Sequence, residues 1–260
     1  MGPSDAGPQG AWGLTNVGQV CAAEDDESRW PALISHHFDM MFRVREGANA
    51  ARAESADFAR IRDRVTLRLW ERHVMERVPI VAREDVPGLL TVLSIDSEEA
   101  VETVKPDIAA LWGMDDDDLF DLALENTRRL LGEVTVQPID GTRLKALDSD
   151  NGYYVATLAL DIESFPELFG RHGAFIAVPQ RGVLLGLPFD GIEDAVVSLS
   201  QLMHIAAGLE RDGPGSLSRR IYWRHEGTWT EIPYEITDSA LNVTPPQSLI
   251  ALLNEIGERA

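Results

Sequence analysis

The sequence predicts an α+β protein, with a mixed or antiparallel sheet, helices packed on one face of it, and a helical N-terminal extension. Runs of β-branched residues bounded by Pro and Gly occur over residues 65–96 and again after residue 134, and such runs are typical of strands. Apolar residues follow helical spacing over residues 119–130 and 192–206, as in helices that pack one face on a core. Strands and helices do not alternate strictly along the chain, which argues against a doubly wound parallel sheet.

The N-terminal quarter divides into a tail and a helical extension. Residues 1–27 are rich in Gly, Pro, Ala and acidic residues without periodicity, so we expect a flexible tail. Residues 28–64 form the helical extension, with a helix predicted over residues 30–45 and a loop or surface helix over residues 47–60. One face of the predicted helix carries Leu33, His37, Met40 and Met41, which fits helical periodicity. The α+β domain then covers residues 65–260.

The next segment is predicted to form three strands and two helices. Strands are expected over residues 65–70, 78–82 and 89–96, and a helix over residues 97–104 is stopped by Pro106. A second helix begins in the run Asp115–Asp118 and ends at Gly132, a suitable C′ residue. Four aspartates invite a metal site, but successive helical residues point about 100° apart and cannot converge on one ion. We interpret the run as an N-cap that the helix dipole favours.

The second half of the chain is predicted to contain two hairpins among helices. A strand over residues 134–139, a turn at 148–152, a strand over 153–160 and a short helix over 164–170 come first. The remaining predicted elements are the hairpin of residues 174–179 and 183–187 around Gln180-Arg181-Gly182, a long helix over 191–210, an aromatic hairpin over 220–233 and a last helix over 246–258.

Composition argues against several classes of partner. The chain has 23 Lys and Arg against 43 Asp and Glu, a formal charge of -20, so its average field repels nucleic acid and anionic membrane surfaces. We expect neither as a partner. The single cysteine, Cys21, leaves no intrachain disulfide and no thiolate-rich metal site, which fits a reducing compartment. The chain shows no signal-peptide pattern and no stretch near the roughly 18 apolar residues of a membrane span, so we expect a cytoplasmic, bacterial-type protein.

Three short motifs lie between about Val81 and Ser200: Trp112-Gly-Met with Asn126-Thr-Arg, the Gly152-Tyr-Tyr strand, and Ala177-Val-Pro-Gln-Arg-Gly-Val-Leu. Together they resemble the YtpQ-like family of uncharacterised bacterial proteins. That family pattern has a Trp-Gly leading into a helix that ends near an Asn, then a Gly-Tyr strand, then Ala-Val-Pro with an Arg two residues on. Gln180 stands where the pattern has a small polar residue, and the first 64 residues have no counterpart. The resemblance implies a cytoplasmic α+β protein of unknown activity and lends no catalytic residue.

Motifs for nucleotide binding or nucleophilic catalysis are missing from the sequence. It has no P-loop, no Gly-x-Gly-x-x-Gly after a strand and no Gly-x-Ser-x-Gly elbow, and we expect no cofactor. The one local cluster of metal-ligand residue types is His36-His37-x-Asp39. On a helix His36 and Asp39 are i and i+3 neighbours that could share a metal cation, whereas His37 faces elsewhere. The alternative is a boundary pair, with His37 toward the core and His36 in water.

Candidate binding residues lie on the two predicted hairpins. Arg181 occupies a hairpin tip, where its guanidinium fork suits a carboxylate of a partner; the alternative is an ordinary turn arginine kept for solubility. Tyr222, Trp223 and Trp229 could anchor an interface, although a two-stranded ribbon needs an apolar core face, which we favour for them. We predict a non-catalytic interaction or adaptor module that binds a protein partner. The alternative is a hydrolase with a metal-assisted site around His36 and Asp39.

Overall fold

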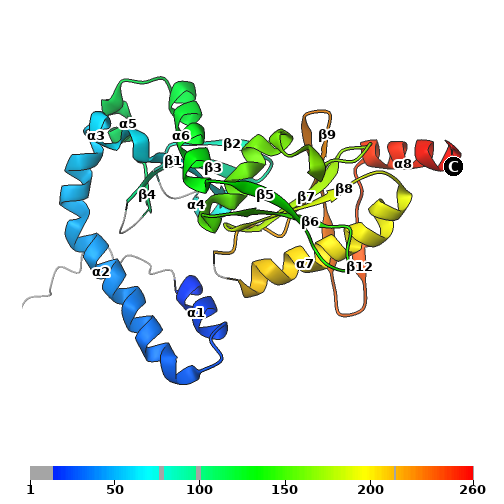
Figure 1. Cartoon of the computed structure of the whole chain (residues 1–260), viewed down its shortest axis with the longest axis horizontal. Helices are drawn as coiled ribbons and strands as arrows, with labels where there is room; N and C mark the ends of the chain where they lie inside the picture. The colour runs from blue at the N-terminus through cyan, green and yellow to red at the C-terminus, as the bar shows by residue number, and fades with distance from the viewer. Residues whose placement is uncertain (1–13, 76–78, 98–100, 214, 260) are drawn as a thin grey trace, which may run out of the picture.

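The structure, a computed structural model, describes residues 14–75, 79–97, 101–213 and 215–259. Helices and antiparallel sheets make up these residues, so the predicted α+β class is confirmed (Figure 1). No helix among the described residues combines the length and the apolar content needed to cross a bilayer.

The first sheet contains β1 (Val65–Glu71), β2 (Ala82–Val86), β3 (Leu89–Asp96) and β4 (Val101–Thr103), and β3 pairs with the other three. The helix predicted over residues 97–104 is wrong at residues 101–103, which form β4. Val101 and Thr103 are β-branched, and they pair with β3 beyond the end of β2, so pairing overrides the weak helical signal. Residues 98–100 lie outside the described part. The strand expected over residues 78–82 begins only at Ala82, and residues 76–78 are likewise not described.

Helices cover one face of the first sheet. The elements are α3 (Phe58–Ile61), α5 (Pro106–Trp112) and α6 (Asp116–Leu131), with the short turns η2 (Arg62–Arg64) and α4 (Arg72–Met75) at the two ends of β1. Their buried side chains form one cluster with those of β1 and β3. The capping prediction for α6 is confirmed, because the Asp115 carboxylate accepts a hydrogen bond from the backbone N–H of Asp117 at 3.0 Å. Gly132 ends the helix with a φ of +67°, a conformation that favours glycine.

The second sheet has the strand order β10-β9-β7-β8-β6-β5. Its strands are β5 (Val134–Pro138), β6 (Lys145–Ser149), β7 (Ala174–Gln180), β8 (Val183–Pro188), β9 (Ile221–His225) and β10 (Thr228–Ile232). The π-helical turn η5 (Asp194–Ser198) leads into α7 (Leu199–Asp212), which runs along one face (Figure 1). The last elements are the ribbon of β11 (Tyr234–Ile236) and β12 (Leu241–Val243), and α8 (Gln247–Arg259).

A long 3₁₀ segment lies between the two sheets. This segment, η3 (Gly152–Ser164), replaces the strand predicted over residues 153–160 and is followed by η4 (Pro166–Leu168). Its residues from Tyr154 to Ala159 are buried, and it contacts strands of both sheets. An uninterrupted apolar run has no period that separates a buried strand from a buried helical segment. The strand prediction failed because the segment is buried on all sides, so its sequence shows no alternation of polar and apolar residues that would separate a strand from a helical segment.

The free edge of β1 is covered by side chains. Leu67 donates its N–H to the hydroxyl of Thr127 on α6 at 2.9 Å, and its carbonyl accepts from the hydroxyl of Thr157 on η3 at 3.3 Å. Asn126 donates to the carbonyl of Val65 at 2.8 Å. These bonds satisfy backbone groups that an edge strand would otherwise leave open, and they hold β1 against η3.

The N-terminal residues are more structured than expected. Residues 15–22 of the predicted tail form α1 (Thr15–Ala22), followed by η1 (Glu27–Arg29) and α2 (Trp30–Ser55). Cys21 on α1 is 7% exposed, and Gln19 donates to the hydroxyl of Ser216 at 2.6 Å. The tail prediction therefore fails for this segment, because contacts with distant residues supply the burial that its composition lacks. Residues 1–13 lie outside the described part, and α2 continues ten residues past the predicted end at residue 45.

Candidate functional site

Arg181 is the sequence-predicted residue that leads to the site. It follows β7 at the turn of the predicted hairpin, and this turn contacts two other segments of the chain. The Arg181 N–H donates to the carbonyl of Gly215 at 3.1 Å, and its carbonyl accepts from Ala156 at 2.8 Å. A Cβ on Gly182 would come within 2.8 Å of the Gly152 carbonyl oxygen. The turn therefore rests on η3, and the Arg181 side chain is half-buried.

Two arginine side chains share two aromatic rings at this place. The guanidinium carbon of Arg181 lies 4.9 Å from the ring centre of Trp70 and 5.8 Å from that of Tyr153. The guanidinium carbon of Arg68 lies 5.0 Å from each of the same two ring centres. Arg181 also donates to the Tyr153 hydroxyl at 3.4 Å. We call Arg68, Trp70, Tyr153 and Arg181 the arginine–aromatic site.

Arg68 is the inner member of the site and Tyr153 an outer one. Arg68 is 6% exposed, whereas Tyr153 is 42% exposed. Burial lowers the pKa of the Arg68 guanidinium; the nearby Arg181 charge lowers it further, and Tyr153, Tyr154 and Asp96 oppose the shift. An arginine nevertheless keeps its charge at neutral pH. Among the described residues no carboxylate lies within 4.0 Å of either guanidinium group, so the two charges have no ion-pair partner there.

Five buried polar atoms in and around the arginine–aromatic site have no hydrogen-bond partner among the described residues. They are Thr66 Oγ1, Arg68 Nη2, Trp70 Nε1, Ser94 Oγ and Tyr154 OH, and we call them the polar row. The first three residues alternate along β1 and so share one face of the sheet. Ser94 is opposite Thr66 in the β1–β3 register and shares that face.

Tyr154 joins the polar row from η3. Burial raises the pKa of its hydroxyl well above 10.0, so the group stays protonated at neutral pH and can donate a hydrogen bond. Thr66 lowers that pKa and Asp96 raises it, each as a hydrogen-bonding neighbour of the hydroxyl. Neither contact, however, meets the distance and angle of a full hydrogen bond. Asp96 is half-buried and supplies the one carboxylate that bears on this end of the row.

The sequence contains a signal for Arg68 that the pattern analysis missed. The strand reads Val65-Thr-Leu-Arg-Leu-Trp, and its polar or amphipathic positions alternate with aliphatic ones. A charged residue at the centre of a buried strand is rare unless it has a partner or a role. No signal could place Tyr153 beside Arg68, because η3 and β1 are about 85 residues apart in the chain and were both predicted to be strands.

The aromatic residues of the C-terminal hairpin belong to the core or its border. Tyr222 is fully buried and donates its hydroxyl to the Pro87 carbonyl at 2.8 Å. Trp223 is 4% exposed and donates its indole N–H to the His172 carbonyl at 2.9 Å. Trp229 is half-buried, with the Arg224 guanidinium carbon 4.8 Å from its ring centre. Tyr222 therefore joins the two sheets from inside, and Trp223 packs within the second sheet's own core, so neither offers a surface.

The predicted metal pair lies on the first half of α2. His36 and Asp39 are exposed, and His37 is half-buried with its ring edge-on to Phe38. Within the ranges that the structure covers, no three His, Cys, Asp or Glu side chains gather as metal ligands would. The structure thus adds no third ligand to His36 and Asp39.

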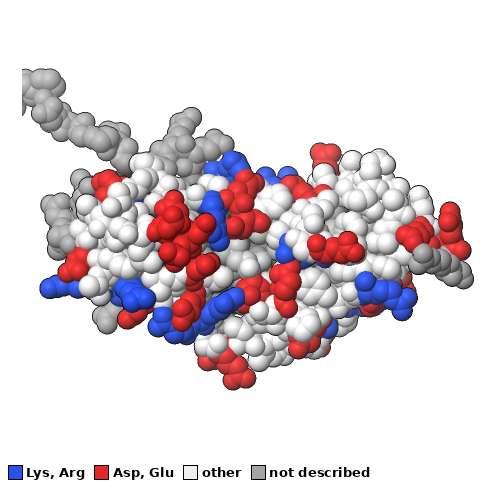
Figure 2. Space-filling model, turned by 90° about the horizontal axis from the view of Figure 1, so that it is seen from above, with Lys and Arg blue, Asp and Glu red and all other residues white. Residues whose placement is uncertain are grey.

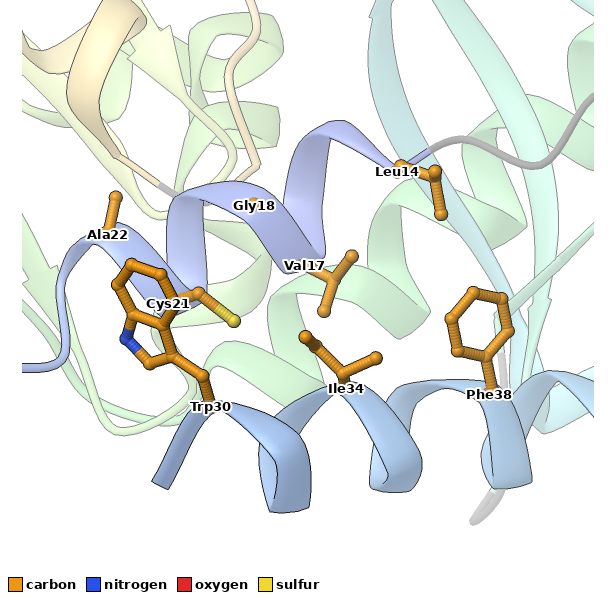
Figure 3. A pocket seen from close by; sticks show the side chains of 8 residues that line it. All are labelled: Leu14, Val17, Gly18, Cys21, Ala22, Trp30, Ile34 and Phe38. Carbon is orange, nitrogen blue, oxygen red and sulfur yellow. The ribbon is translucent and has the colours of Figure 1, made fainter. Parts of the chain in front are cut away.

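Two further hollows lie away from the arginine–aromatic site. A cavity of about 390 Å³ lies between α1 and α2, and Figure 3 shows Val17, Ile34 and Phe38 pointing toward one another across it. Its lining is apolar apart from the thiol of Cys21 and the indole of Trp30, so it offers few groups that could orient a ligand. A second hollow, of about 440 Å³, is lined mainly by charged side chains. Two of these, Arg220 and Glu71, already form an ion pair with each other at 2.7 Å.

Comparison of the chain with models of protein families, with curated proteins and with solved structures finds no match. The resemblance to the YtpQ-like family therefore stays a prediction. The arginine–aromatic site and the polar row have to be interpreted from their own chemistry.

Proposed function

We propose that this chain is a non-catalytic cytoplasmic module that binds an anionic group of a partner protein at the arginine–aromatic site. One observation carries the proposal: the guanidinium groups of Arg68 and Arg181 face the same two aromatic rings, and no carboxylate of the described residues lies within 4.0 Å of either group. Two neighbouring cations repel each other, and burial of one of them adds a desolvation penalty. Contact with aromatic faces offsets only about 0.5 to 2 kcal/mol of such a penalty. A bound anion would offset the rest.

Other arginines of the chain show what the usual arrangement is. Arg143, Arg220 and Arg224 each reach a carboxylate, at 2.6, 2.7 and 2.7 Å. On the face shown in Figure 2, basic and acidic side chains likewise lie next to one another. With 43 acidic residues for 23 basic ones, a carboxylate is easily found by an arginine. Two arginines that share a site without one are therefore an exception that calls for an external anion.

A partner protein fits this site better than an extended polyanion. The chain carries a charge of -20, which repels nucleic acid over most of the surface. One anionic side chain of a protein partner, in contrast, can bind through the two neighbouring arginines alone. Arginine and aromatic residues also dominate the energetics of protein interfaces, and Tyr153 with Arg181 forms the accessible rim of the site.

The groups of the site favour binding over catalysis. Arginine cannot act as a base at neutral pH, and the raised pKa of Tyr154 keeps that hydroxyl protonated as well. Neither Thr66 nor Ser94 has a hydrogen-bonded base that could activate it as a nucleophile. The set consists of donors, which hold an anion rather than transform it. The hydrolase alternative stays a prediction, and no contact among the described residues speaks for it.

Retrieval from a native lysate by the immobilised full chain tests the proposal. Arg181→Ala should reduce the amount of each specific partner about tenfold, as expected for loss of one charge-assisted contact. Arg171→Ala is the matched control, because Arg171 is exposed and its side chain lies outside the site. The melting temperatures of both variants should stay within about 2 °C of the parent. Equal retrieval by both variants, or a fall of several degrees for Arg181→Ala alone, would contradict the proposal.

A further inference from the structure

The polar row contains more hydrogen-bond donors than a carboxylate can use. Its members offer two hydroxyls on β1 and β3, one phenol, one indole N–H and one guanidinium nitrogen. All five atoms are enclosed, and none has a partner within the described residues. Buried polar groups are nearly always hydrogen-bonded, so five such atoms, four on one face of the first sheet and one on η3, are far from the usual pattern. Burial of these groups away from water costs free energy, which suggests that a ligand forms the missing hydrogen bonds with them.

The number and type of these donors indicate the ligand. A carboxylate has two oxygens and one charge, which a single bidentate arginine already matches. A phosphoryl group on a protein side chain has three terminal oxygens and a charge of about -1.5 to -2 at pH 7. Two guanidinium groups match that charge. The two hydroxyls and the indole N–H then supply donors for oxygens that the arginines leave unfilled.

The arrangement also suggests a path for the ligand. Arg181 and Tyr153 are the outer members of the arginine–aromatic site, and Arg68 lies beneath them at 6% exposure. An anion would first meet Arg181 and would reach the enclosed row only if the Arg181 or Tyr153 side chain moves aside. Arg181 is attached to a clamped turn, so its backbone can stay in place while the side chain swings. Asp96 borders the Tyr154 end of the row and would repel an anion there, which limits the ligand to the Arg68 side.

Resting on the proposed function, we infer that the anion is a phosphoryl group carried by a side chain of the partner protein, held by Arg68 and Arg181 and read by Thr66, Ser94 and Trp70. The chain would in this way distinguish a phosphorylated partner from an unphosphorylated one. Carboxylates would bind at the arginines alone, more weakly and without use of the two hydroxyls.

Calorimetric titration of the full chain with three small probes tests this inference. Phenyl phosphate represents a phosphorylated side chain, benzoate is the carboxylate of similar shape, and inorganic phosphate has no organic part. At about pH 7.5 the phosphate monoester is mostly dianionic. Phenyl phosphate should bind at least about tenfold more tightly than benzoate, because it uses additional charge-assisted hydrogen bonds.

Three variants distinguish a specific contribution of the polar row to phosphate binding from a general effect of mutation on the protein. Thr66→Val and Ser94→Ala each remove one hydroxyl of the row and should weaken phenyl phosphate about tenfold while leaving benzoate unchanged. Thr91→Val is the matched control: its hydroxyl is also buried and unpaired, but it lies on the opposite face of β3, across from Leu69. That variant should bind both probes as the parent does. If one of the two variants of the polar row fails to fold, the other is sufficient for the test.

Several outcomes would overturn the inference. If phenyl phosphate binds no better than benzoate while Arg68→Met abolishes both, the site takes anions as proposed but is not selective for phosphoryl groups. If neither probe binds, the row holds buried water rather than a ligand. If inorganic phosphate binds as tightly as phenyl phosphate, the ligand is the free ion and not a partner's side chain. Failure of the proposed function itself shows separately, as unchanged retrieval by the Arg181→Ala protein.

Discussion

The two faces of the β1–β3 pair differ in almost every physical respect. One face presents Val65 and Leu67 to a cluster of aliphatic and aromatic side chains beneath α5 and α6. The other presents Thr66 and Arg68, whose Oγ1 and Nη2 atoms are buried without a hydrogen-bond partner in the described part of the chain. Side chains of a strand alternate between the faces, so consecutive residues of one strand serve both environments. The apolar face holds the sheet to its helices, and the polar face holds the candidate site.

The contrast shows where this protein departs from the rules of a stable core. Sequences usually satisfy every buried polar group, and the exceptions concentrate at functional sites. Thr91 is an exception on the apolar side, because its hydroxyl is buried and unpaired as well. One such group can be an isolated defect. Four on the opposite face, one of them on Arg68 itself, together with the Tyr154 hydroxyl from η3, indicate a site whose stability depends on a ligand.

The largest effect is expected on the apolar face. Leu93→Ala should lower the free energy of unfolding by about 2 to 5 kcal/mol, since Leu93 is fully buried and its truncation leaves a cavity. Chemical denaturation measures the change. Leu111→Ala is the matched control, because Leu111 on α5 is 64% exposed, and it should change stability by less than about 0.5 kcal/mol. A loss at Leu93 as small as that at Leu111 would mean that this face does not hold the sheet.

Two buried threonines should respond in opposite directions. Thr127→Val removes a hydroxyl that accepts from Leu67 and donates to the Ala123 carbonyl at 2.7 Å, so it should cost about 1 to 3 kcal/mol. Thr66→Val removes a hydroxyl that has no partner, so it should leave the ligand-free protein unchanged or about 1 kcal/mol more stable. Denaturant unfolding of the two variants measures both changes in the free energy of unfolding. A destabilised Thr66→Val protein would show that its hydroxyl is satisfied in solution, and the contrast between the faces would weaken.

The polar face should also contribute to loss of stability in alkaline solution. Burial raises the pKa of Tyr154 above 10.0, so the unfolded chain loses this proton at a lower pH than the folded chain does. The stability that depends on this proton is fully present below about pH 10 and falls as the pH rises further, by up to about 1.4 kcal/mol per pH unit. Tyr234, whose pKa burial raises to about 12, acts in the same direction.

Tyr154→Phe should therefore flatten the alkaline fall. Urea unfolding from about pH 9 to about pH 11 gives the slopes. Identical slopes for the parent and Tyr154→Phe would mean that the hydroxyl is hydrated in the folded protein.

Much of the local structure could be predicted from the sequence, because its signals are local. The aspartate that caps α6 and the glycine that ends it act through backbone groups a few residues away. The strands β1 and β3, the hairpin at Arg181 and the last helix likewise follow from short-range patterns of branching, turn residues and helical spacing. Together these signals determined the α+β class and placed Arg181 at a turn.

The site itself was decided by tertiary structure. Arg68, Tyr153 and Arg181 come from β1, η3 and the β7–β8 turn, and no pattern within any one segment records that the three meet. The 3₁₀ form of η3 and the strand β4 were mispredicted for a related reason, since burial and pairing with distant segments outweighed local preference. The sequence by itself determined the capped helix α6, the strands β1 and β3 and the hairpins, because these depend on local signals. Only the packing of the two sheets around η3 decided that two arginines would share their aromatic rings.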